Sequence, residues 1–142
     1  MSLREVTGET VGAVCALEVR PDQRGFVASN ALSIAEAHFE PHGWFRAIYA
    51  DETPVGFLMV YEDAEAGEFH LWRFMVDAEH QGKGYARGAL DLLVDELRSR
   101  GVPHLMLSYV DGELGPAGFY RKYGFAETGE VDHGEIVMRL DL

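Results

Sequence analysis

The residues best suited to chemistry lie in one glycine-containing stretch, His80-Gln81-Gly82-Lys83-Gly84-Tyr85-Ala86-Arg87-Gly88. Gly82 and Gly84 allow a tight turn that brings the backbone close to a ligand. The first N–H groups of a helix that begins just after them are unpaired, and the helix dipole places positive charge at the same point. This combination binds phosphate, and Lys83 and Arg87 add cationic side chains. The stretch therefore predicts a site for the pyrophosphate of a cofactor.

Two strands and a helix must hold this loop in place. A strand-like run from Phe69 to Val76 leads into the loop, and residues 104–110 predict a second strand further on. Between them, a helix with one apolar stripe leaves the loop and ends before Gly101 and Pro103. The stripe comprises Ala86, Ala89, Leu90, Leu93, Val94 and Leu97. The unit is thus strand, glycine loop, helix, strand.

Further elements lie on both sides of this unit. Before it we expect a short strand at 3–6, a helix from Thr10 to about Val19, and helical structure at 23–39 with a break near Ser29-Asn30, then strands at 44–50 and 55–61. After it we expect a helix from Pro116 to Tyr123 and strands at 125–130 and 135–140. No linker or repeat divides the chain, so we expect one domain over residues 1–142.

Composition and charge limit the class of protein. Of the 142 residues, 47% are apolar and 25% are charged, as in an ordinary globular domain. The net charge of −12 disfavours binding to nucleic acid or to an anionic membrane and suits a cationic partner. No apolar run approaches the ~20 residues that span a bilayer. The N-terminus lacks the apolar region of a secretory signal and Cys15 is the single cysteine, so a cytoplasmic protein is expected.

Two motifs resemble those of a known family. Gln81-x-x-Gly84-x-Ala86 is similar to the Gln/Arg-x-x-Gly-x-Gly/Ala loop of the GNAT superfamily of acetyl-CoA-dependent N-acetyltransferases. Gly118-Phe119-Tyr120-Arg121-Lys122-Tyr123-Gly124-Phe125 resembles the family's second signature, a Phe-Tyr-x-x-x-Gly-Phe helix end. The resemblance implies an α/β (α+β) fold, in which a mixed, mostly antiparallel sheet of about six to seven strands is flanked by about four helices. In that fold the sheet splays apart between the strands at 69–76 and 104–110.

The resemblance also implies roles for individual residues. The pantetheine arm of acetyl-CoA would lie in the gap and pair with the strand before the loop, and the loop would bind the pyrophosphate. Tyr120 would lie near the acetyl sulfur and protonate the leaving thiolate; the alternative is a tyrosine that only packs in the core. The expected cofactor-binding residues are Phe74, Met75, Val76, Gln81, Gly82, Lys83, Gly84, Tyr85, Ala86, Arg87 and Tyr120.

A second, shorter resemblance concerns the acceptor. The segment from Phe26 to Ala37 is similar to the polyamine (spermine/spermidine) acetyltransferases of bacteria, in which this region covers the acceptor site. It implies that the acetyl group goes to a primary amine, with a polyamine as the expected acceptor. Glu36 and Glu40, which are one helical turn apart, and Trp72 are the expected substrate-binding residues. For either carboxylate the alternative is a solvated helix face.

Direct attack by the amine needs a base and a donor to the developing oxyanion. We expect the main-chain amide of Val76 to be that donor. His70 takes the position, six residues earlier, where the family often has its base, and histidine titrates in the useful range. Glu68 and a water chain are the alternatives. Strand alternation predicts one shared face for His70, Trp72, Phe74 and Val76.

The sequence is also compatible with other functions. Glu113 stands where the family often carries an asparagine that contacts the pantetheine arm, which leaves a non-catalytic acyl-CoA sensor as one alternative. Another amine, such as a peptide N-terminus, an amino acid or an antibiotic, is a second. No residue cluster predicts a metal site. A homodimer is common in the family.

Overall fold

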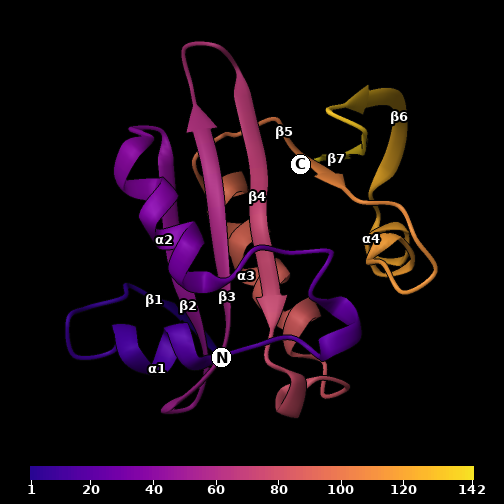
Figure 1. Ribbon diagram of the computed structural model, residues 1–142. Helices are drawn as coiled ribbons and strands as arrows, with labels where there is room; N and C mark the ends of the chain where they lie inside the picture. Colours follow the sequence, from indigo (N-terminus) through magenta and orange to yellow (C-terminus); the bar gives the residue numbers. More distant parts are fainter.

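The computed structural model describes all 142 residues and contains one seven-stranded sheet with four α-helices (Figure 1). In chain order the elements are β1 (Ser2–Arg4), α1 (Val11–Ala16), the 3-10 turn η1 (Pro21–Gln23), α2 (Asn30–Phe39), β2 (Gly43–Ala50), β3 (Thr53–Asp63), β4 (Glu68–Val76), the 3-10 turn η2 (Ala78–His80), α3 (Tyr85–Ser99), β5 (His104–Tyr109), α4 (Ala117–Tyr123), β6 (Ala126–Asp132) and β7 (Glu135–Asp141). The strand order is β1-β2-β3-β4-β5-β7-β6. Only β4 and β5 run parallel. The predicted mixed, mostly antiparallel sheet is confirmed.

Helices cover both faces of the sheet. The apolar stripe of α3 is buried on one face, and its buried members are Ala89, Leu90, Leu93, Val94 and Leu97, as predicted; Ala86 is half-buried. α1 and α2 lie over the opposite face (Figure 1), where Val14 is buried with Phe57 and Met59. Full burial of one such side chain contributes about 1.5–3 kcal/mol. The two clusters fix β3 and β4 between two apolar layers.

The helices near the N-terminus are shorter than predicted. α1 ends at Ala16 rather than at about Val19. α2 begins at Asn30 because the Ser29 hydroxyl accepts a hydrogen bond from the Leu32 N–H at 3.1 Å, which caps the helix. The predicted break near Ser29-Asn30 is therefore the start of α2. Residues 17–28 connect the two helices and contain only the short turn η1.

The predicted splay of the sheet lies between β4 and β5. These two strands are paired at one position, His70 opposite Met106. Toward their C-terminal ends they separate (Figure 1), whereas β5 pairs with β7 along its whole length. The residues of β4 beyond His70 consequently have a strand partner on one side only.

A β-bulge in β4 changes which side chains share a face. The register between β3 and β4 shifts by one between Met59 and Val60, which makes Trp72 an extra residue. Trp72 packs against the cluster under α1 and α2, whereas Phe74 packs against the cluster under α3. The prediction of a single shared face is therefore wrong for the set His70, Trp72, Phe74 and Val76.

No helix of the structure has the length and the apolar character that a membrane span needs. No group of three or more histidine, cysteine, aspartate or glutamate side chains lies close enough together to hold a metal ion. Cys15 is a free, half-buried cysteine of α1.

Gly56 of β3 lies so close to β4 that a side chain does not fit. A Cβ atom there would overlap the main-chain carbonyl oxygen of Met75. We expect Gly56→Ala to lower the free energy of unfolding by about 2 kcal/mol, because the strands must move apart to admit the methyl group. Urea titration followed by circular dichroism measures this loss. Gly12→Ala in α1, with nothing within 4 Å, is the control and should lose no stability; equal losses in both variants would contradict the close approach.

Candidate active site

A cavity of about 900 Å³ lies in the splay between β4 and β5. Residues between 19 and 28 form one wall, and β4 from Leu71 to Val76 forms another. Residues between 80 and 87, at the start of α3, line one end. The remaining wall comes from residues between 108 and 120, with Glu135 of β7. The glycine loop, the open edge of β4 and α4 therefore line one cavity, although α4 lies far from the other two in the sequence.

The edge of β4 that faces β5 offers free main-chain groups. The Asp77 N–H donates to the Val55 carbonyl at 2.8 Å, and alternation along the antiparallel pair then directs the main-chain groups of Phe74 and Val76 away from β3. In agreement, the Val76 carbonyl accepts a hydrogen bond from the Gln81 side chain at 3.0 Å. An extended ligand in the gap can pair with this edge as an added strand does.

The glycine loop has the geometry of a phosphate cradle. Gly82 and Gly84 have φ angles of 77° and 81°, which place both in the left-handed region that favours glycine. Gly84 is the N-cap of the 15-residue helix α3 and has no side chain to cap it, so the first N–H groups of α3 are free for a ligand. Both glycines and Arg87 line the cavity, whereas Lys83 lies outside its lining. A pyrophosphate group fits these donors and charges.

Tyr120 of α4 lies at the inner part of the cavity wall. It is 7% exposed, and burial raises the pKa of its phenol above the ordinary value of 10.0, which keeps the hydroxyl protonated and able to donate. The rings of Phe119 and Tyr120 are 5.5 Å apart, and the rings of Phe119 and Phe74 are 6.2 Å apart. These contacts place Tyr120 at the level of Phe74 along β4.

His70 and Glu68 lie outside the cavity lining, which begins on β4 at Leu71. Because Phe69 and Leu71 are both buried under α3, His70 between them points to the face that carries α1 and α2. Its ring contacts the Tyr61 ring, with centroids 6.1 Å apart. Burial lowers the pKa of His70 below the ordinary value of 6.5, so the imidazole is neutral and can accept a proton at neutral pH. Glu68 is exposed at the first position of β4.

The expected acceptor residues have three different placements. Trp72 lines the cavity. Glu36 of α2 lies behind this wall and pairs with Arg73, a cavity-lining residue, at 3.3 Å between Oε1 and Nη2. Glu40 ends outside the cavity lining, where its carboxylate accepts a hydrogen bond from the His42 N–H at 3.1 Å. Of the three, only Trp72 faces the cavity directly.

Three of the four arginines that line the cavity are paired with carboxylates, whereas two cavity carboxylates are unpaired. Arginines 20, 24 and 73 each lie within 3.5 Å of a carboxylate: Arg20 with Asp22, Arg24 with Glu18, and Arg73 with Glu36. Glu113 and Glu135 also line the cavity, and no cationic side chain lies within 4.0 Å of either. Sequence reasoning missed Glu135 as a site residue, because no motif marks β7 and only the fold brings it beside Ser108, 3.4 Å away.

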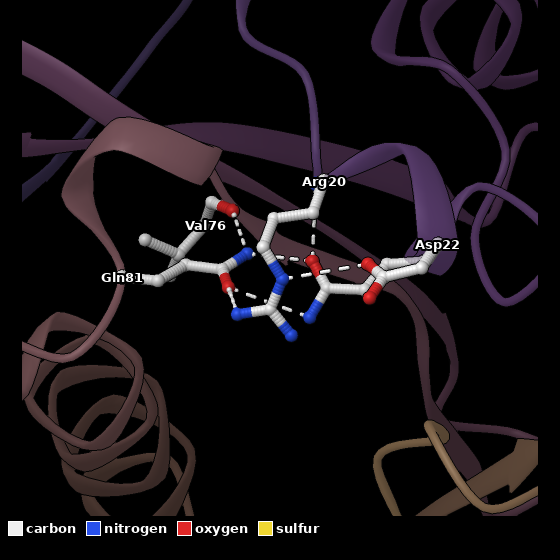
Figure 2. Close-up of polar contacts among 5 residues, drawn as sticks. Arg20, Asp22, Val76 and Gln81 are labelled. Carbon is white, nitrogen blue, oxygen red and sulfur yellow. Dashed lines mark hydrogen bonds and ion pairs between the residues drawn. The ribbon is translucent and has the colours of Figure 1, made fainter.

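A polar network beside the glycine loop was also invisible in the sequence. Figure 2 shows Gln81 between Val76 and Arg20, with Asp22 on the far side of Arg20. The Gln81 side chain also donates to the side-chain oxygen of Gln23 at 2.8 Å. The residues from the 17–28 connection lie about 60 positions from Gln81, and no local pattern predicts such a contact.

Comparison with known proteins assigns the class. A sequence profile of the acetyltransferase (GNAT) family matches residues 28–125, which is more than half of the chain. The chain belongs to this family, as the two motifs predicted, and it is an acetyl-CoA-dependent N-acetyltransferase. Along its whole length it is 27% identical to the spermine/spermidine N(1)-acetyltransferase of Bacillus subtilis (strain 168), 99% of which is covered by the match.

Solved structures share the fold at low sequence identity. The GNAT domain of S. lividans PAT superposes with a TM-score of 0.78 at 15% identity, over 99% of this chain and 89% of that one. A GNAT family acetyltransferase from Elizabethkingia anophelis with acetyl-CoA bound has a TM-score of 0.64 at 17% identity, over 80% of this chain and 84% of that one. These likenesses support the architecture described above and its splayed sheet.

Proposed function

We propose that this N-acetyltransferase transfers the acetyl group of acetyl-CoA to a primary amine of a polyamine such as spermine or spermidine. The observation that carries the proposal is the charge of the cavity. Glu113 and Glu135 are carboxylates without a cationic partner, whereas the three arginines of the 17–28 wall and β4 are neutralised by neighbours. An unpaired carboxylate in a cavity binds an ammonium group favourably. The full-length likeness to a spermine/spermidine acetyltransferase supports the same acceptor.

A polyamine suits this arrangement because its ammonium groups are spaced along a flexible methylene chain. One terminal nitrogen must be neutral to attack, while the other nitrogens stay protonated and need counter-charges. Glu113 precedes α4 and Glu135 begins β7, so the two carboxylates come from different elements of one wall. Trp72 and Arg73 line the wall nearer to α2, and Glu36 pairs with Arg73 behind that wall. We propose that Glu113 and Glu135 hold the remote end of the acceptor.

The residues that would hold acetyl-CoA follow from the cradle and the open strand. The N–H groups at the start of α3, with Gly82, Gly84 and Arg87, would bind the pyrophosphate. The main chain of Phe74 and Val76 would pair with the pantetheine arm. When bound, the group supplies an activated acetyl as a thioester. Lys83, which is exposed beside the cradle, adds long-range attraction for the phosphates rather than a contact from the cavity lining.

We propose Phe74, rather than Val76, as the donor to the carbonyl oxygen. Val76 lies at the end of β4 next to the glycine loop, and its carbonyl is already bonded to Gln81. The acetyl end must lie further from the pyrophosphate, and Tyr120 is at the level of Phe74. The Phe74 N–H points to the open edge, so it can stabilise negative charge that develops on that oxygen.

The reaction then balances as one acyl transfer. The amine nitrogen bonds to the carbonyl carbon, the carbon–sulfur bond breaks, and the electron pair of that bond goes to sulfur. The Tyr120 hydroxyl gives its proton to the sulfur, and the phenolate then takes a proton from water, because burial favours the neutral phenol. The amine gives its proton to a water molecule, and further water passes the proton on to His70. The water is needed because four strand residues, ~13 Å, separate His70 from Phe74.

Release of free CoA from acetyl-CoA tests the acceptor. The panel is spermine, spermidine, putrescine, lysine, an aminoglycoside and a peptide N-terminus. We expect turnover with the polyamines and a KM for spermidine raised about tenfold in Glu135→Gln, since one ion pair is lost. Glu130→Gln on exposed β6, outside the cavity lining, is the matched control and should keep the KM. Turnover with another amine alone would replace the polyamine, and acetyl-CoA binding without any turnover would make the protein a sensor.

Tyr120→Phe removes the hydroxyl that we assign to the thiolate. We expect kcat to fall about 10²–10⁴-fold, the usual contribution of a general acid, while the Kd for acetyl-CoA measured by calorimetry stays the same. Tyr123→Phe is the control in the same helix, because its hydroxyl donates to Asp91 at 2.7 Å and it lies outside the main cavity lining. If kcat is unchanged in Tyr120→Phe, another group protonates the sulfur.

The pH dependence of kcat/KM tests His70. The imidazole must be neutral to accept a proton, so activity should fall as the pH drops through the pKa of His70. Because burial lowers that pKa, the acid limb should have its midpoint below about 6.5. His70→Ala should flatten this limb, and His42→Ala, an exposed histidine of the α2–β2 turn, should keep it. An acid limb that survives in His70→Ala would assign it to another titrating group and remove His70 as the base.

A further inference from the structure

Residues 17–28, which we call the bridging segment, are fastened to the end of β4. The Glu18 N–H donates to the Asp77 carboxylate at 2.9 Å, and the Ala78 N–H donates to the Glu18 carbonyl at 2.8 Å. Figure 1 shows the chain between α1 and α2 passing in front of β4 before it returns to α2. The segment therefore lies across the strand that forms one wall of the cavity.

The Gln81 side chain makes a second attachment, beside the glycine loop. Its Nε2 donates to Gln23 Oε1 at 2.8 Å and to the Val76 carbonyl at 3.0 Å (Figure 2). Its Oε1 accepts from Arg20 Nη1 at 3.0 Å and from Gln23 Nε2 at 3.4 Å. The two donors of the amide and both lone pairs of its oxygen are thus in use. The Gln81 side chain positions the bridging segment, and only its main chain is free for a ligand.

The other end of the bridging segment contacts the opposite wall. Phe26 reaches the loop before α4, where a Cβ atom on Gly112 would lie 3.1 Å from the Phe26 ring and one on Gly115 would lie 3.0 Å from it. Neither glycine is among the residues with positive φ, so their backbone conformation does not call for glycine. The space left by the missing side chains is filled by the ring. Phe26, Gly112 and Gly115 all line the cavity.

The contact between the Phe26 ring and the two glycines narrows the cavity between the bridging segment and the 112–115 loop. Glu113 lies between the two glycines in this loop, and Glu135 lines the same cavity from β7. An acceptor held by Glu113 therefore lies beside the Phe26 ring, which limits the width of the acceptor.

We propose that Phe26, seated on Gly112 and Gly115, selects the acceptor by width and admits slender linear amines while it excludes branched or bulky ones. This inference rests on the proposed polyamine acetylation, whose unbranched acceptor it explains, and it names the residues that set the selectivity. Phe26 is a specificity residue, and Gln23 with Gln81 are positioning residues that hold its segment in place. The selection acts through shape, because the ring adds no charge to the cavity.

The test compares Phe26→Ala with wild type on spermidine and on a glycine-terminated tripeptide. The readout is the ratio of kcat/KM for spermidine to that for the tripeptide. We expect this ratio to fall at least about tenfold in Phe26→Ala, because the opened wall admits the wider amine. Phe39→Ala is the matched control, since Phe39 is 82% exposed at the end of α2 and should leave the ratio unchanged.

Gly115→Ala tests the same contact from the opposite wall. The added methyl group would lie 3.0 Å from the Phe26 ring and 3.1 and 3.2 Å from the carbonyl oxygens of Gly112 and Val110, so the ring and the loop must both move. We expect the KM for spermidine to rise while the calorimetric Kd for acetyl-CoA stays the same. Gly118→Ala in α4, with nothing within 4 Å, is its control and should change neither value. Thermal unfolding of each variant shows that it is folded, and Gly115→Ala keeps the proposal testable if Phe26→Ala is not.

The outcomes separate this inference from the function on which it rests. If wild type discriminates between the two amines and folded Phe26→Ala discriminates equally well, selection by Phe26 is wrong and the polyamine function stands. If wild type does not acetylate spermidine at all, the polyamine function is wrong. Direct binding of the two amines, measured by calorimetry with CoA present, gives a readout without turnover: both proteins should bind spermidine, and Phe26→Ala should bind the tripeptide where wild type does not.

Discussion

The interruption of pairing between β4 and β5 is the constraint on which the site depends. The two strands meet only where His70 lies opposite Met106, and beyond that point one edge of β4 has no strand partner. Unpaired main-chain groups are costly when they are buried, so such an edge persists only where a ligand or water can reach it. Here it lines a cavity of about 900 Å³. The missing strand partner is what leaves room for this cavity.

Three features keep the interruption from closing. α3 is anchored by five buried side chains on one face of the sheet, which fixes the glycine loop at the end of β4. The bulge at Trp72 shifts the alternation of β4, so Trp72 and Phe74 face opposite apolar layers. Bulges bend the strand that contains them and increase its twist. β5 is held away from β4 because it pairs along its length with β7 instead.

The cavity of this acidic chain carries charges of opposite sign in different places. The net charge is −12, yet the end of the cavity at the start of α3 presents helix N–H groups and Arg87. Three other cavity arginines are neutralised by neighbouring carboxylates, so they add little net field. The two carboxylates that stay unpaired lie on the α4 and β7 side. The cavity therefore has one end suited to phosphate and one wall suited to ammonium.

The sequence alone determined the parts whose information is local. Glycine spacing at 82 and 84, the apolar stripe of α3 and the Phe-Tyr helix end each lie within one short segment, so the glycine turn, the helix and the family could be predicted and are confirmed. The ends of α1 and α2 were less well predicted. Apolar residues keep a helical spacing beyond the true end of a helix, and the cap that sets this end, such as Ser29, is a signal of only a few residues. Strand positions were predicted to within a few residues for the same local reasons.

Only the tertiary structure decided the bulge, the pairing of charges and the path of residues 17–28. Each depends on partners that are distant in the sequence. The bulge at Trp72 depends on the register with β3, the charge of Glu36 is paired by Arg73, and the path of residues 17–28 is held by the contact of Gln23 with Gln81. A carboxylate looks the same in a sequence whether a guanidinium lies 3.3 Å away or nothing does, although its charge is available to a ligand only in the second case. The topology of the chain brings such partners together, and a local sequence pattern does not predict which residues will meet.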